Sequence, residues 1–110
     1  MPYLAKPGRP KPEQRRDSDA RRGSAHERGY TRRWQQRAAL FKQRYSLCGM
    51  RPNGAAPVMS RCHERGLLTL AYQVDHVVPH RRDERLLWDE EGNWQSLCRA
   101  CGARKSRAGL

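Results

Sequence analysis

The sequence predicts a small α+β domain that has too little apolar mass to fold without help. Helical periodicity covers residues 31–45 and returns from 99 to about 107, and two short runs, 71–77 and 94–97, favour β-strands. Only 36% of the 110 residues are hydrophobic, and a chain of this length forms one small domain at most. Bound metals commonly stabilise such domains, and four cysteines are present.

The first predicted helix is amphipathic. Trp34, Ala38, Phe41 and Tyr45 fall at i, i+4, i+7 and i+11 and form one apolar stripe. Thr31, just before it, is a favourable N-cap residue. We expect the stripe to pack on the core, while the other faces either follow a nucleic-acid backbone or are simply solvated. These faces are basic and carry Arg32, Arg33, Arg37, Lys42 and Arg44.

The segment before this helix differs in composition. Residues 1–29 are rich in Pro, Gly, Arg, Ser and Asp and contain few large apolar side chains. Such a segment buries too little surface to offset its ordering entropy. We therefore predict a disordered basic arm over 1–29, followed by one domain over 30–110. The arm either adds phosphate contacts or serves as a solubilising linker.

The charge distribution favours a polyanionic partner. The formal net charge is +12, which points above all to nucleic acid. Residues 63–92 carry seven acidic and four basic side chains between basic flanks, as expected for a carboxylate site within a phosphate-binding surface or for a solvated acidic loop. No apolar run approaches the roughly 20 residues of a membrane span, and the chain start lacks a secretory signal. We expect a cytoplasmic protein without a membrane partner.

The middle of the chain is predicted to be irregular. Residues 46–63 contain the turn signal Arg51-Pro52-Asn53-Gly54. Gly66 marks a turn before the first strand, and Pro79 ends that strand's pairing. Residues 80–92 are expected to form a charged loop that leads to the second strand.

The cysteines predict a closed zinc site. Cys98-x2-Cys101 is half of a zinc knuckle, a spacing that lets two thiolates bind one face of a tetrahedral ion. Cys48 and Cys62 are the candidates for the second half, although 13 residues separate them, and His63 is an alternative fourth ligand. Because reduced thiols are the rule in the cytosol, we expect structural Zn²⁺ whose binding free energy contributes to folding.

An acid, an imidazole and an amide precede the knuckle. Phosphodiester hydrolysis needs an activated water and positive charge on the phosphoryl oxygens. A histidine is a suitable general base because its pKa lies near neutrality, and His76 follows Asp75 directly. Adjacent strand residues point to opposite faces, so these two side chains share a site only where the strand ends or bends. Asn93, taken alone, is equally typical of a turn.

The order of these motifs resembles the HNH endonucleases. The resemblance rests on Asp75-His76-Val77-Val78-Pro79-His80, on Asn93-Trp94 and on Cys98-x2-Cys101. It extends from about Arg28 to Ala108 and is closest to small phage and prophage HNH proteins often encoded beside packaging genes. It implies a ββα-metal (His-Me finger) fold and metal-dependent DNA cleavage, by nicking or by double-strand cutting. It also implies a bacterial host cell and an association with phage terminase or other packaging proteins.

The resemblance also implies roles for individual residues. His76 would be the general base, and Asp75 would bind a catalytic Mg²⁺ or Mn²⁺, with Ni²⁺ as a further possibility. Asn93 would either orient the His-bearing loop or lie near that cation. The four cysteines match the zinc ligands of the family. Six side chains would hold phosphates: Arg32, Arg33, Arg37, Arg104, Lys105 and Arg107.

Two departures from the family pattern stand out. A Gly- and Pro-rich insertion separates Cys48 from its partner, and Gly102 occupies the position where a final His commonly follows the last Cys. Glycine has no ligand atom, which leaves three outcomes. Asn93 and waters complete the cation shell, His80 or Asp83 supplies a ligand, or cleavage has been lost while binding remains.

These departures keep other functions open. One is a catalytically weakened zinc protein that binds DNA as a packaging accessory. Another is a structural zinc protein that bridges packaging subunits. Ribonuclease activity is a further alternative, because the sequence shows no feature that would distinguish RNA from DNA by its 2′-hydroxyl. No helix stands out as one that would contact bases in the major groove, so we expect weak preference for a particular DNA sequence.

Overall fold

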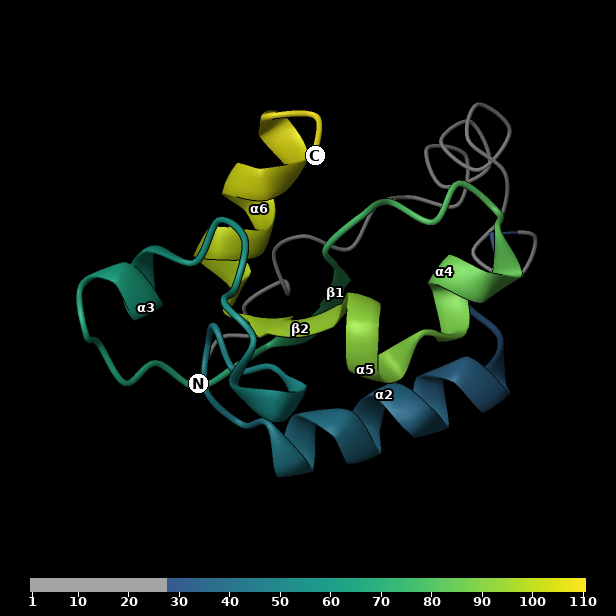
Figure 1. The fold of residues 1–110 in the computed structure, drawn as a ribbon, viewed down its shortest axis with the longest axis horizontal. Helices are drawn as coiled ribbons and strands as arrows, with labels where there is room; N and C mark the ends of the chain where they lie inside the picture. Colours follow the sequence, from purple (N-terminus) through teal and green to yellow (C-terminus); the bar gives the residue numbers. More distant parts are fainter. Residues whose placement is uncertain (1–27) are drawn as a thin grey trace, which may run out of the picture.

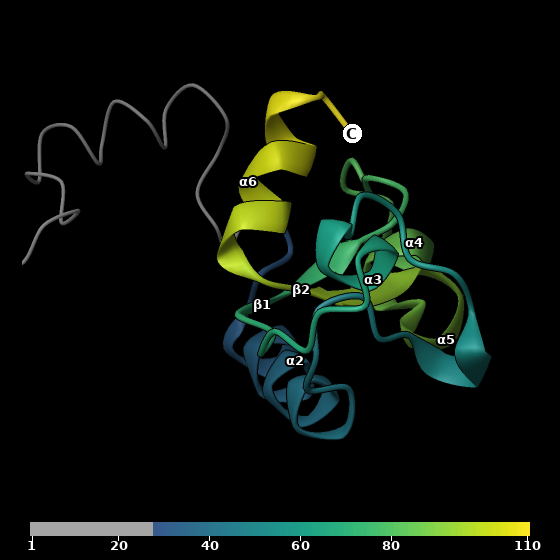
Figure 2. The same cartoon turned by 90° about the vertical axis from the view of Figure 1, so that its left-hand side faces the viewer.

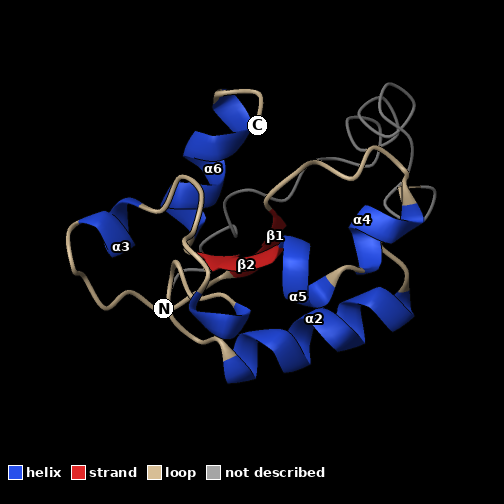
Figure 3. Cartoon of the chain, viewed as in Figure 1, coloured by secondary structure: helices blue, strands red, loops and turns tan. Residues whose placement is uncertain are grey.

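The structure is a computed structural model that describes residues 28–110. The predicted arm over 1–29 lies outside the described residues apart from its last two positions. The regular elements appear in the order α2, η1, α3, β1, α4, α5, β2, α6. Figures 1 and 3 show a short sheet between helices.

The centre of the fold is a two-stranded antiparallel sheet. β1 (Gln73–His76) pairs with β2 (Trp94–Leu97) so that Gln73 lies opposite Leu97 and His76 opposite Trp94. Helix α2 (Arg32–Arg44) and helix α6 (Arg99–Arg107) lie on opposite sides of this sheet (Figures 1 and 2). Because side chains alternate along a strand, β1 directs successive residues toward one helix and then the other.

Helix α2 forms as its sequence predicts. The Thr31 side chain accepts a hydrogen bond from the Trp34 backbone N–H at 3.2 Å, which caps the first turn. The expected stripe is buried at three positions, Trp34, Ala38 and Phe41. They pack with Leu87 and Trp94 as the main apolar cluster. This cluster holds α2 against the sheet.

The segment between α2 and β1 is partly ordered. It contains a 3₁₀ turn, η1 (Pro52–Gly54), at the predicted turn signal. It also contains a single-turn helix, α3 (Arg61–Glu64), that was not predicted. Ser60 caps α3 by accepting a hydrogen bond from the His63 backbone N–H. Arg51 fastens this segment to the end of α5 and the start of β2, because its guanidinium donates to the carbonyls of Gly92 and Trp94.

The charged loop predicted over residues 80–92 differs from the structure. It contains two short helices, α4 (Glu84–Trp88) and α5 (Glu90–Asn93). Asp83 and Asp89 cap them by accepting hydrogen bonds from the backbone N–H groups of Arg85 and Gly92. Leu87 anchors α4 in the core. Capping aspartates and one buried leucine therefore suffice where local periodicity is too short to indicate a helix.

Other boundaries agree with the sequence. β2 has the predicted limits, and α6 ends at the predicted residue. The first strand is shorter than its predicted range of 71–77, because Ala71 donates its backbone N–H to Ser46 instead of joining the pairing with β2. The predicted α+β class is confirmed: a β-hairpin is followed by a helix beside a four-cysteine cluster.

Candidate active site and cysteine cluster

The four cysteines form one compact group. Their Sγ atoms all lie within 4.8 Å of one another, and all four residues are buried. Cys62 Sγ is 3.9 Å from Cys98 Sγ and 4.0 Å from Cys101 Sγ. A tetrahedral zinc ion with Zn–S bonds of about 2.3 Å requires sulfur atoms about 3.8 Å apart. The donor set and the spacing therefore fit a structural zinc ion.

The ligands of this group come from three parts of the chain. Cys48 follows α2, Cys62 lies in α3, and Cys98 and Cys101 form the cap and first turn of α6. His63, the alternative fourth ligand, is exposed and outside the group. Thus the long Cys48–Cys62 spacing does not prevent convergence, because α3 folds back against the start of α6.

The thiols differ in acidity. Burial raises the pKa of Cys48 to about 12 and also raises the pKa of Cys98. Burial acts in the same direction on Cys101, but hydrogen bonds from the Cys62 backbone and from the Cys98 thiol lower its pKa to about 6. A cation at the centre would favour deprotonation of the remaining thiols, so metal binding is coupled to proton release.

His76 is held in one defined orientation. It is the last residue of β1, and its buried ring stacks on Trp34 with centroids 5.7 Å apart. Its Nε2 lies 3.0 Å from the Leu87 carbonyl oxygen. A carbonyl only accepts, so Nε2 carries the proton and Nδ1 presents its lone pair when the ring is neutral. Burial lowers the pKa of His76, which favours that neutral form.

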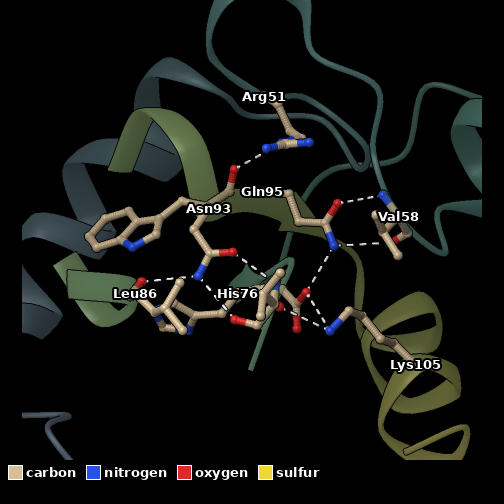
Figure 4. A network of polar contacts seen from close by, with 10 residues as sticks. Arg51, Val58, His76, Leu86, Asn93, Gln95 and Lys105 are labelled. Carbon is tan, nitrogen blue, oxygen red and sulfur yellow. Dashed lines mark hydrogen bonds and ion pairs between the residues drawn. The ribbon is translucent and has the colours of Figure 1, made fainter. Parts of the chain in front are cut away.

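Asn93 connects the segment after His76 to α4. Its Oδ1 accepts a hydrogen bond from the Val78 backbone N–H at 2.7 Å, and its Nδ2 donates to the carbonyls of Val78 and Leu86, each at 3.0 Å. Asn93 is almost completely buried. Figure 4 shows its amide directed toward Leu86 and the backbone beyond His76. All of these partners are backbone groups, so the amide fixes the turn that directly follows His76.

Asp75 faces helix α6, whereas His76 packs against helix α2 on the other side of the sheet. Its Oδ2 accepts a hydrogen bond from Gln95 Nε2 at 2.8 Å and lies 3.2 Å from Lys105 Nζ. Gln95 also bonds both backbone groups of Val58, which locks its amide orientation. Neither Gln95 nor the role of Lys105 was predicted from the sequence. Alternation along β2 could have indicated Gln95, since it lies opposite Asp75 in the strand register.

Lys105, one of the residues predicted to hold phosphates, differs from its expected exposure. It was expected on the exposed face of the last helix, but it is only 2% exposed. Its ammonium donates to the His76 carbonyl oxygen at 2.9 Å and pairs with Asp75. The physical reason is position: Cys98, Cys101 and Lys105 share one face of α6, and the cysteines turn that face inward.

The other predicted phosphate-binding residues lie nearer the surface. Arg32, Arg33, Arg37 and Arg107 are exposed, whereas Arg104 is half-buried. Arg37 pairs with Glu90 at 3.0 Å, and Arg33 lies over the Trp88 ring. Arg104 donates to Cys101 Sγ at 3.8 Å and so supports the cysteine cluster. The α2 arginines do not line the pocket that contains His76.

Asp75 and His76 line one pocket of about 300 Å³. The end of β1 brings them to the same pocket. Arg81 and Arg82, expected only as part of a charged loop, also line this pocket, and so does Arg28, which precedes α2. The cationic side chains at this pocket are Arg28, Arg81, Arg82 and Lys105.

His80 and Tyr30 also line the pocket. His80 Nδ1 accepts a hydrogen bond from the Arg82 backbone N–H, and its Nε2 lies 3.1 Å from the Tyr30 hydroxyl. Both ring nitrogens are therefore engaged. Arg81 and Arg82 have φ angles of 45° and 66°, a left-handed conformation that strains non-glycine residues. Asp83 caps α4 and is not part of the pocket wall.

Gly102 is buried beneath a side chain of β1. A Cβ atom at this position would lie 2.5 Å from Gln73 Nε2. The Gln73 amide thus occupies the space beside α6 that a larger side chain at 102 would need. Among residues 28–110, the four cysteines are the only group of three or more His, Cys, Asp or Glu side chains arranged to hold a metal.

The comparisons with known proteins agree with this geometry. Residues 60–107 match the family model of the HNH endonucleases. Searches of curated proteins and of solved structures returned no match. No helix within residues 28–110 is long and apolar enough to cross a membrane. The matched segment contains both strands, α6 and three of the four cysteines, so residues 60–107 correspond to an HNH endonuclease domain, a family of nucleases that act on nucleic acid.

Proposed function

We propose that this protein is an endonuclease that hydrolyses DNA phosphodiester bonds, with His76 as the general base. The observation that carries the proposal is the hydrogen bond from His76 Nε2 to the Leu87 carbonyl. It leaves Nδ1 as the basic nitrogen of a ring that also lines the pocket. A water molecule beside Nδ1 would give up its proton as its oxygen attacks phosphorus.

The surroundings of His76 support this role. Asn93 fixes the turn after β1 through three hydrogen bonds to backbone groups. We therefore assign Asn93 as a positioning residue that keeps the imidazole aligned with the attacked phosphate. Arg28, Arg81 and Arg82 would hold phosphate oxygens at the rim of the pocket, where positive charge stabilises the pentavalent transition state.

A Mg²⁺ or Mn²⁺ ion at Asp75 would compete with contacts that this carboxylate already makes. Such a cation commonly binds through one or two carboxylates and keeps several waters, and here Asp75 Oδ2 already accepts from Gln95 and pairs with Lys105. Gly102 contributes no ligand, and Asn93 is bonded to backbone groups. The steps assigned to His76, Asn93 and the arginines do not require that cation.

The zinc site has a separate role in this proposal. Zn²⁺ bound by Cys48, Cys62, Cys98 and Cys101 would supply folding free energy and no open coordination position. It would hold α3 and α6 against the sheet. Association with phage packaging proteins stays a prediction from the family resemblance.

A second candidate function is DNA binding without cleavage. The observation that favours it is the pairing of Asp75 with Lys105 beside a ligand-free Gly102. In this candidate the basic pocket and the exposed arginines would bind phosphates, and no bond would be broken. The packaging-accessory alternative belongs to this candidate.

Plasmid cleavage by the zinc-loaded protein distinguishes the two candidates. The assay compares the wild type with His76→Gln, which keeps a donor for Leu87 but lacks the imidazole, in buffers with Mg²⁺, Mn²⁺, Ni²⁺ or no added cation. We expect the variant to lose about 100-fold or more in cleavage rate. The matched control, His63→Ala, removes an exposed histidine outside the pocket and should cleave normally.

The same assay defines the failure of the proposal. Full cleavage by a correctly folded His76→Gln protein would exclude His76 as the base. Absence of cleavage by the wild type in every buffer, together with salt-sensitive DNA binding, would favour the second candidate. An RNA of matching sequence, tested in parallel, decides between deoxyribonuclease and ribonuclease activity.

A further inference from the structure

Lys105 is a buried ammonium in the wall of the candidate active site. It is 2% exposed, its Nζ lies 3.2 Å from Asp75 Oδ2 and 2.9 Å from the His76 carbonyl oxygen, and it lines the pocket. Figure 4 shows it reaching from α6 toward His76. An ammonium has three N–H donors, and these two acceptors leave one of them. A buried charge is retained only where it is paired.

The atoms near this ammonium are arranged for a monovalent side-chain cation. Gln95 directs its Nε2, a donor, at the same Asp75 oxygen, and its contacts with Val58 hold it in that orientation. A metal ion would need acceptor atoms at this place. The Gln73 amide fills the space above Gly102 where another ligand would otherwise lie.

The charge of the pocket points the same way. Among the described side chains that line it, Arg28, Arg81, Arg82 and Lys105 are cationic, and Asp75 is the one carboxylate. Such a pocket attracts a phosphate and repels a free divalent cation. A phosphate in it would face His76 on one side and the Lys105 ammonium on the other.

We propose that the Lys105 ammonium takes the place of the catalytic divalent cation in this domain, so that cleavage does not require a free divalent metal. The inference rests on the proposed nuclease function. Water oxygen bonds to phosphorus, the water proton passes to His76 Nδ1, and the bond from phosphorus to the leaving oxygen breaks. The Lys105 ammonium stabilises the phosphoryl charge, the leaving oxygen takes a proton from solvent, and His76 releases its proton to solvent.

The first test measures Mn²⁺ binding and needs no catalytic activity. Full-length zinc-loaded protein is titrated with Mn²⁺, and the signal of free aqueous Mn²⁺ is followed by electron paramagnetic resonance. We expect the wild type and Asp75→Asn to give the same weak, sub-stoichiometric binding. Binding of one Mn²⁺ per chain by the wild type that disappears in Asp75→Asn would overturn the proposal.

The second test measures cleavage in buffer freed of divalent cations, with zinc retention confirmed by metal analysis. We expect wild-type cleavage to persist and Lys105→Met to lose about 100-fold, with partial recovery in Lys105→Arg. Lys42→Met is the matched control, because Lys42 donates to the Tyr72 carbonyl outside this pocket. Its activity should not change.

The two tests distinguish a failure of the proposed Lys105 role from a failure of the proposed nuclease function. Wild-type cleavage that appears only after divalent cations are added would overturn the role of Lys105 but retain the nuclease. A Lys105→Met protein that folds, retains zinc and cleaves normally would also overturn it. No cleavage under any condition would overturn the nuclease function itself, and the Mn²⁺ titration would still report whether Asp75 binds a cation.

Discussion

Two sites on one face of α6 have opposite character. At its start, Cys98 and Cys101 join Cys48 and Cys62 in a group that consists of thiols alone. One turn later, Lys105 joins three arginines around a single carboxylate. The first arrangement attracts a metal ion, and the second attracts an anion. The comparison teaches that family resemblance transfers the scaffold more safely than it transfers the ligand set.

The difference lies in how each group is neutralised. Clustered thiols gain from deprotonation only if a cation enters, as the low pKa of Cys101 beside the high pKa of Cys48 illustrates. Asp75 is already neutralised by Lys105 and hydrogen-bonded by Gln95. An external cation at Asp75 would first have to displace a buried ammonium.

The largest effect is expected at the cysteine cluster. Zinc removal by a chelator, or Cys98→Ser, should unfold the domain, because the remaining core of five buried residues is small and structural zinc supplies folding free energy directly. Circular dichroism and metal analysis measure the outcome. Persistence of a cooperative thermal transition without bound metal would contradict the assignment. Lys105→Met should retain zinc, which separates the two sites.

A smaller effect is expected at Asn93. Asn93→Ala leaves the Val78 and Leu86 backbone groups without partners and should destabilise the fold by about 2 kcal/mol. Denaturant unfolding measures this, with Gln43→Ala, on the exposed face of α2, as the control.

Asn93→Asp tests the alternative role of this residue. The substitution keeps an acceptor but removes both amide donors, so a positioning residue should lose stability and cleavage. If Asn93 instead ligated a cation, the added carboxylate should strengthen Mn²⁺ binding. That gain would contradict the positioning role.

The smallest effect is expected in the pocket loop. Arg82→Gly should relieve left-handed strain and raise the free energy of unfolding by about 1 kcal/mol. It should also weaken DNA binding and lower the salt dependence by about one phosphate contact. Arg82→Ala removes the same charge but keeps the Cβ atom, so only the glycine variant should be stabilised. Equal stability of the two variants would argue against strain.

Local sequence signals predicted much of this fold. The Thr31 cap, the apolar stripe, β2 and the end of α6 were all visible in the pattern. Helices α3, α4 and α5 were missed because each is four or five residues long. Elements of that length are stabilised by caps and by tertiary packing, which periodicity does not report.

The sequence by itself determined the chemistry available: four thiols, one Asp-His pair, a central Asn and a glycine where a ligand was expected. Only the tertiary structure decided the partners. Lys105 meets the His76 carbonyl across 29 positions, and Gln95 meets Asp75 across 20. Such long-range pairs depend on how α6 and β2 pack on β1. The packing converts a lysine expected at the surface into the buried cation of the pocket.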